Sequence, residues 1–183
     1  MPPQETPKPA PSAAASNLTA RDIAEILREQ GWLVGDASSA QFAWCERAAA
    51  LLGPQTSDRR TLAELLHLVF HYDAQELLSR VENHAVLSRY AARDVLRHLA
   101  LLLLDGAPLT TDRFKEVVNA LKDSLGIRSR ELFHPIRLAL AGRVGEGELD
   151  RVILLLDEAA TLSFASPVKS ARERILEFCS ALD

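Results

Sequence analysis

The chain has 183 residues, of which 48% are hydrophobic and 5% aromatic, and its formal net charge is −4 at pH 7. This length and hydrophobic content suit one ordinary domain or two small ones with a packed core. An acidic chain has no overall positive field that attracts nucleic acid, so a nucleic-acid site must be a local cluster of basic residues. Arginine greatly outnumbers lysine, which favours bidentate contacts with phosphate, carboxylate or bases and equally fits a GC-rich genome.

Cysteine usage and the N-terminal segment argue against secreted and membrane proteins. Cys45 and Cys179 lie far apart and form neither a disulfide framework nor a zinc pattern, so we expect a cytoplasmic location. The longest apolar run, Leu99 to Leu104, is too short to span a membrane. Residues 1–16 hold five of the nine prolines and lack the pattern of a secretory signal, so we predict a disordered tail there.

Helical periodicity and helix-start signals follow one another from residue 17. Thr19 with Asp22 predicts a capping box for the first helix, and Gly31 should end it. Leu and Ala dominate the segments that follow, which favours helices over strands. The further helices predicted in the first part of the chain cover residues 39–53, 61–72 (starting on a capping box of Thr61 and Glu64), 73–82 after a break near Asp73, and 85–104.

The second part of the chain continues the helical pattern. Residues 110–126 give the clearest amphipathic helix, with Thr111 as its cap and Gly126 as its end. The next helix should carry Pro135 in its first turn, where a missing N–H costs nothing, and end at Gly142. Two more are predicted over residues 148–157 and 166–183, the latter starting on Ser166 and Pro167.

No alternating strand pattern or hairpin signal interrupts these helices. The sequence therefore predicts an all-α fold of roughly eight helices in two packed subdomains. The first subdomain should cover residues 17–106. The second should cover residues 107–183 and carry the pattern FxPIRxALxG.

Histidines and cysteines give only weak signs of chemistry. His67 and His71 lie four residues apart with Glu64 one turn earlier, which permits metal chelation, but no HExxH glutamate or Cys/His set supports it. A half-exposed helix with two polar positions is the simpler interpretation, and no metal is expected.

A nucleophilic Cys45 would need a base supplied by the fold. It shares an apolar stripe with Phe42, so a buried structural cysteine is favoured, and Cys179 beside Phe178 is interpreted in the same way. Nucleotide-binding and hydrolase motifs are absent. We therefore expect no cofactor and no catalytic site.

Arginines around the FxPIRxALxG pattern are the remaining candidates. Arg128, Arg130 and Arg143 fall in the turns at either end of the predicted helix, where guanidinium groups can reach phosphates or base edges. Arg137 is a fourth candidate, but it lies inside an apolar helix. For this residue a structural arginine bonded to carbonyls or to a carboxylate is the favoured interpretation.

The segment from Gly126 to Asp157 resembles the C-terminal anticodon-binding region of bacterial-type glutamyl-tRNA synthetases. That family carries hydrophobic-x-Pro-[Leu/Ile]-Arg-x-Ala-Leu-[Thr/Ser]-Gly, followed by a loop and a hydrophobic helix. The similarity extends upstream through "RRTLAELLHLVFHYD" and "ILREQGWLV" and covers residues 17 to about 157. The matching residues are Gly126, Phe133, Pro135, Ile136, Arg137, Ala139, Leu140, Gly142 and Leu149.

Three positions depart from the family pattern. Ala141 replaces the usual Thr or Ser, Glu146-Gly147 stands where Gly-Pro is usual, and Asp157 stands where Gly usually ends the helix. The HIGH and KMSKS signatures of the catalytic half are absent, so aminoacylation by this chain alone is not expected.

The resemblance leaves three functions open. The first is a stand-alone, non-catalytic module that binds tRNA or another structured RNA through splayed-out bases. The second is a protein-interaction module that kept the fold and lost RNA, favoured by the net charge and by acidic residues at 146, 148 and 150. The third is the C-terminal part of a split synthetase whose catalytic half acts in trans. No membrane or DNA partner is expected.

Overall fold

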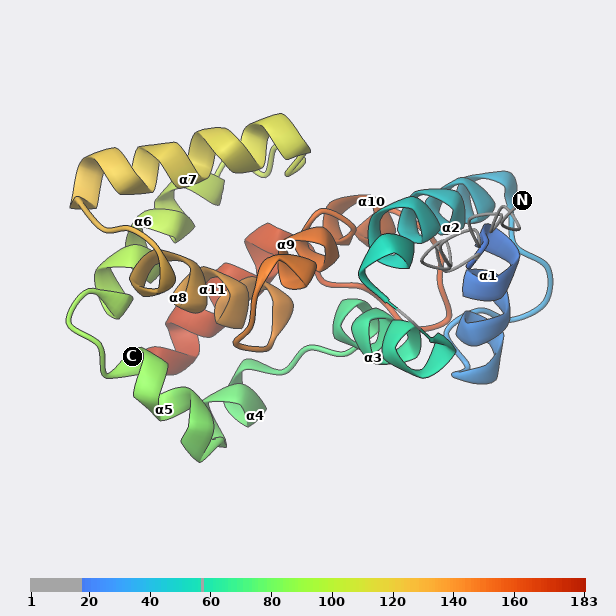
Figure 1. The fold of residues 1–183 in the computed structure, drawn as a ribbon, viewed down its shortest axis with the longest axis horizontal. Coiled ribbons are helices and arrows are strands. Elements are labelled where there is room, and N and C mark those ends of the chain that lie inside the picture. The colour runs from blue at the N-terminus through green and yellow to red at the C-terminus, as the bar shows by residue number, and fades with distance from the viewer. Residues whose placement is uncertain (1–17, 57) are drawn as a thin grey trace, which may run out of the picture.

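The computed structural model describes residues 18–56 and 58–183, and the tail predicted over residues 1–16 lies outside them. Helices and turns account for this part of the chain, which contains no strand (Figure 1). The all-α prediction is confirmed. The helices are α1 (Ala20–Glu29), α2 (Ser39–Leu52), α3 (Arg59–Phe70), α4 (Ala74–Ser79), α5 (Val81–Leu87), α6 (Ala92–Leu103), α7 (Thr111–Leu125), α8 (Arg130–Ala141), α9 (Gly147–Ile153), α10 (Leu156–Ala160) and α11 (Ala171–Leu182), with a 3-10 turn η1 (Gly53–Gln55) after α2.

The helices form an elongated molecule (Figure 1). Helices α1, α2, α3 and α10 lie toward one end, and α4 to α8 with α11 lie toward the other. Helix α9 connects the two groups, because it packs against α8 on one side and against α2 and α3 on the other. Buried side chains from both ends form one continuous apolar cluster.

The subdomain boundary at residues 106 and 107 stays a prediction. Helix α6, which precedes it, packs against α7, α8 and α11, which all follow it. None of the described helices is long and apolar enough to cross a membrane.

Several predicted helix ends are confirmed. Thr19 and Asp22 form the capping box of α1: the Asp22 N–H donates to Thr19 Oγ1, and the Thr19 N–H donates to Asp22 Oδ2 at 2.7 Å. This backbone hydrogen bond is the main cause that lowers the pKa of Asp22. Gly126 and Gly142 follow α7 and α8 with φ values of 64° and 79°, a conformation that glycine adopts without steric cost.

Two predicted N-caps were wrong because another side chain lies closer to the free N–H groups. Helix α3 starts after Asp58, whose Oδ1 accepts the Thr61 N–H at 2.7 Å, so Thr61 and Glu64 do not cap it. Helix α7 is capped by Thr110 rather than Thr111, because Thr110 Oγ1 accepts the Arg113 N–H at 3.1 Å.

The start predicted for the last helix was also wrong. Ser170 and Glu173 form the capping box of α11, and the Ser166 hydroxyl instead donates to the Phe70 carbonyl at 3.5 Å. The helix therefore begins at Ala171, and the segment before it crosses the end of α3.

The long helices predicted over residues 85–104 and 148–157 are each interrupted. A turn over residues 88–91 separates α5 from α6, which lets α5 and α6 both pack on α8 from different directions. A turn at residues 154–155 likewise separates α9 from α10. Tyr90, in the first turn, is fully exposed.

A buried arginine fastens α11 to the ends of two other helices. Arg174 has no exposed surface, and among the described residues no carboxylate lies within ion-pair distance of it. Leu68 and Val69 lie in the last turn of α3, and Leu140 in the last turn of α8, where helices leave carbonyls without partners. The Arg174 guanidinium donates to Leu68 O at 2.9 Å, Val69 O at 2.7 Å, Leu140 O at 3.0 Å and Lys169 O at 3.0 Å, and it stacks 4.7 Å from the Tyr72 ring centroid.

Burial lowers the pKa of Arg174 to about 10, so its charge persists at neutral pH. The surrounding helix C-termini compensate for part of the desolvation, because their carbonyls carry partial negative charge.

Replacing Arg174 by Met should lower the free energy of unfolding by roughly 3 kcal/mol, because the carbonyls it holds would stay buried without donors. Urea unfolding followed by circular dichroism measures the change. Arg97→Met, at an exposed position of α6, is the control and should change stability by less than about 0.5 kcal/mol. Equal effects of the two substitutions would contradict this role of Arg174.

Candidate RNA interface

Helix α8 carries the FxPIRxALxG pattern and starts earlier than predicted. It begins at Arg130 because the N–H groups of Leu132 and Phe133 both donate to the Ser129 carbonyl, at 3.1 and 3.0 Å. Pro135 therefore lies inside the helix and not in its first turn, which corrects the prediction. The apolar residues Ile136, Leu138 and Leu140 have no exposed surface, and Phe133 is half-buried.

Arg137 lies within a network of buried contacts. Its side chain is 9% exposed and holds Asp150 in a bidentate pair: Nε donates to Oδ1 at 2.8 Å, and Nη2 donates to Oδ2 at 3.0 Å. Nη1 donates to the Gly145 carbonyl at 3.0 Å, and the guanidinium lies 4.7 Å from the Phe133 ring centroid. Arg137 thus ties α8 to α9 and to the loop between them.

The loop after α8 is shaped to receive this arginine. A Cβ added to Gly145 would lie 2.8 Å from Leu149 Cδ1, which is closer than side chains tolerate. Glycine therefore lets the loop approach α9 while its carbonyl accepts from Arg137. Arg143, in the same loop, lies 3.9 Å from Glu148.

The three turn arginines do not form one cluster. Arg128 and Arg130 are exposed before and at the start of α8, and Arg143 is exposed beyond its end. Twelve helical residues separate the two ends by about 18 Å. Arg128 and Arg130 have no ion-pair partner within residues 18–56 and 58–183, whereas Arg143 is partly neutralised.

A basic group near the start of α8 comes from a distant segment. Arg89, in the turn between α5 and α6, places Nη1 3.0 Å from His134 Nδ1. Burial is the first cause that lowers the pKa of His134, and the charges of Arg89 and Arg130 lower it further. Sequence analysis missed Arg89, although "SRYAAR" places it beside the exposed Tyr90.

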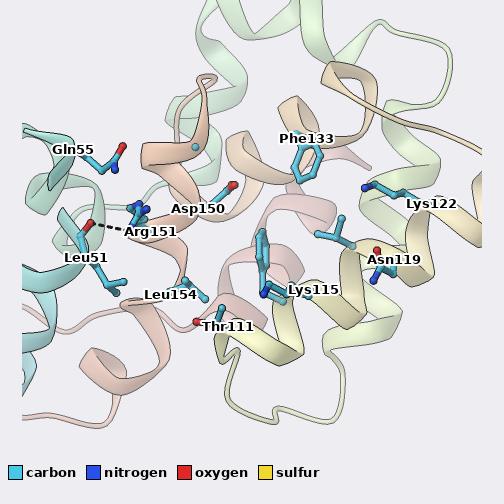
Figure 2. Close-up of a pocket in the computed structure, with 13 residues that line it drawn as sticks. Leu51, Gln55, Thr111, Lys115, Asn119, Lys122, Phe133, Asp150, Arg151 and Leu154 are labelled. Atoms are coloured by element: carbon cyan, nitrogen blue, oxygen red, sulfur yellow. Dashed lines mark hydrogen bonds between the residues drawn. The ribbon is translucent and has the colours of Figure 1, made fainter.

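A cleft opens between α7 and α9, beside Phe133 and Asp150 (Figure 2). Both of these residues contact Arg137. The volume of the cleft is about 690 Å³, in the range of small-molecule sites. Phe133, Asp150 and Arg151 line it from the α8 and α9 side. The other lining residues are Leu51, Gln55, Thr111, Phe114, Lys115, Val118, Asn119, Lys122, Gly147 and Leu154.

The cysteines differ from each other. Cys45 is fully buried, and burial raises the pKa of its thiol to about 11, which leaves it unreactive at neutral pH. Cys179 is only half-buried, with its Sγ 3.7 Å from the Leu96 carbonyl. Phe42, expected on the buried stripe of α2, is 41% exposed.

The paired histidines make contacts of their own. The rings of His67 and His71 stack with centroids 5.1 Å apart, and His71 Nε2 lies 3.0 Å from Glu76. Glu64 instead pairs with Arg60 at 3.4 Å. In the part of the chain that the structure describes, His, Cys, Asp and Glu side chains nowhere gather in threes as a metal site requires.

Residues 17–163 match the family described as an anticodon binding domain. The chain belongs to this family. The glutamate–tRNA ligase of Geobacillus thermodenitrificans is 31% identical over 130 residues, which are 71% of this chain and 26% of that protein. Glutamate–tRNA ligase 2 of Syntrophus aciditrophicus is 29% identical over 67% of this chain and 25% of its own length. No solved structure matches the chain.

These matches confirm the resemblance to the anticodon-binding region of glutamyl-tRNA synthetases. The chain spans about a quarter of the length of these curated relatives, so their ligase activity belongs to much longer proteins. Helix α11, which Arg174 fastens, follows the last residue that the family match covers.

Arg137 and Asp150 should be energetically coupled in this anticodon-binding domain. In a double-mutant cycle of Arg137→Ala and Asp150→Ala, we expect a coupling of about 1.5–3 kcal/mol, because each single change leaves a largely buried charge without its partner. Urea denaturation of the four proteins measures it. A coupling below about 0.5 kcal/mol, typical of exposed pairs, would show that the Arg137–Asp150 ion pair contributes little to stability.

The two thiols should react in a fixed order. At pH 8 roughly one Cys45 thiol in a thousand is ionised with a pKa of about 11, and the residue is also buried. A chromogenic disulfide reagent should therefore label Cys179 first in the folded protein and Cys45 only after unfolding. In Cys179→Ser, rapid labelling of the folded protein would contradict the burial of Cys45.

Proposed function

We propose that this chain is a non-catalytic module that binds tRNA or another structured RNA. The observation that carries the proposal is the match of residues 17–163 to the anticodon-binding family. The all-α fold presents exposed arginines at both ends of the helix that carries the family pattern. Guanidinium groups at such positions suit phosphate oxygens and base edges.

The candidate residues contribute unequally in this proposal. Arg128 and Arg130 supply the main phosphate contacts, because they are exposed and unpaired within the described residues. Arg89, which lies beside His134, extends the same basic surface. Arg143 contributes less, since Glu148 lies 3.9 Å away. Arg137 contributes by holding α8 against α9, because its N–H groups already donate to Asp150 and to the Gly145 carbonyl.

Aminoacylation is not part of this proposal. The relatives named as ligases are about four times as long as the matched region, and that region is the part similar to an anticodon binding domain.

A fluorescence anisotropy titration with tRNA-Glu at 50 mM salt tests the proposal, because phosphate contacts are strongest at low salt. Arg128→Gln/Arg130→Gln should weaken binding about tenfold or more and reduce the salt slope by about 1–2, since two phosphate contacts are lost. Arg21→Gln/Arg97→Gln removes the same charge from exposed positions elsewhere and should bind like the unmodified protein.

Absence of tRNA binding at 50 mM salt would overturn RNA binding in favour of a protein-interaction module. The net charge of −4 and the ion pairs of Arg137 and Arg143 favour this second function. Pull-down with and without RNase separates the two: a protein partner retained after RNase, with no RNA enriched before it, supports protein interaction.

A further inference from the structure

The cleft between α7 and α9 gathers positive charge in an acidic chain. Lys115 and Lys122 line it from α7, and Arg151 lines it from α9 (Figure 2). The two lysines lie seven residues apart, on the same face of the helix as Asn119. They reach the cleft while Phe114 and Val118 of α7 form part of its apolar lining.

Within residues 18–56 and 58–183, no carboxylate forms an ion pair with these cations. Of the three lysines in the described residues, Lys169 pairs with Glu177 at 2.6 Å. Lys115 has no carboxylate partner there, and the Lys122 ammonium contacts the Phe133 ring, 5.7 Å from its centroid. Among the described residues, Arg151 donates a hydrogen bond to the Leu51 carbonyl alone, at 3.4 Å.

Asp150 supplies the single carboxylate among the residues that line the cleft, and it is already paired with Arg137. Both oxygens of Asp150 accept from Arg137, which cancels most of its charge. Three cations therefore line a partly apolar space in which the only carboxylate among the lining residues is already paired with Arg137. Such a space favours a ligand that carries negative charge of its own.

The apolar lining indicates the rest of the ligand. Phe133 and Phe114 offer aromatic surface, and Leu51, Val118 and Leu154 add aliphatic surface. Thr111, Asn119 and Gln55 supply hydrogen-bonding groups among them. An aromatic ring beside a lysine suits a planar base next to a phosphate, because bases stack on aromatic side chains while cations hold the backbone.

We propose that this cleft binds one nucleotide unit, with its phosphate between Lys115, Lys122 and Arg151 and its base against Phe133. The same chemistry is offered by a free mononucleotide and by one unstacked nucleotide of an RNA strand. None of the arginines assigned to RNA under the proposed function lines the cleft. The RNA-strand form rests on that proposed function, and the free-nucleotide form does not.

Isothermal titration calorimetry at 50 mM salt tests the site with AMP, GMP, CMP, UMP and a single-stranded hexaribonucleotide. We expect at least one of these to bind, and Lys115→Gln/Lys122→Gln to weaken its affinity about tenfold or more through the loss of two charged contacts. Arg21→Gln/Arg97→Gln, with the same change in net charge, should bind normally. Phe133→Leu should weaken the nucleotide and leave inorganic phosphate unaffected.

The outcomes separate the two sources and the two proposals. Lysine-dependent binding of a mononucleotide supports a free ligand, and lysine-dependent binding of the hexaribonucleotide alone supports an RNA strand. Binding of neither, or equal weakening in both charge variants, overturns the cleft site. Wild-type affinity for tRNA-Glu in Lys115→Gln/Lys122→Gln, together with no lysine-dependent nucleotide binding, overturns the cleft and leaves the proposed function standing.

Discussion

The guanidinium of Arg174 is the contact on which the arrangement of the helices depends most. It donates hydrogen bonds to carbonyls at the C-terminal ends of both α3 and α8. These two helices belong to opposite ends of the molecule. Asp157 supports the same junction, because its carboxylate accepts from the N–H of Leu109 at 2.6 Å and from the N–H of Ala171 at 2.9 Å. Helix α11 begins after the last residue of the family match. Asp157 holds the first residue of α11, and Arg174 joins the helix to the end of α8.

Arg137 determines which side chains of α8 remain exposed for binding. Its bidentate pair with Asp150 draws α9 against α8 and places Phe133 beside the cleft. The same pair removes the central arginine from any role as an exposed contact. Recognition, if it uses guanidinium groups, then depends on the ends of the helix, where Arg128 and Arg130 stay free of carboxylates within the described chain.

Local signals predicted the fold well and the site only in part. Capping boxes and left-handed glycines act within a few residues, so the ends at Thr19, Gly126 and Gly142 could be predicted. Competing caps such as Asp58 were missed because several polar residues precede α3 and only the path of the chain selects one. The contacts of Arg89 with His134, and of Arg174 with Leu68 and Leu140, join residues 45, 106 and 34 positions apart. No periodicity within a helix carries such information.

Burial separates the roles of the cations in this chain. Where a guanidinium is enclosed, as in Arg137 and Arg174, desolvation makes it costly unless carbonyls or carboxylates surround it, and it then serves the fold. Where a cation is exposed and has no carboxylate partner in the described part of the chain, as in Arg130 and Lys115, water compensates its charge, and an incoming anion gains attraction at little desolvation cost. An acidic chain can therefore attract phosphate locally, where nearby carboxylates such as Asp150 and Glu148 are already paired with arginines. The exposed cations at the start of α8 and along α7 are the candidates for such attraction.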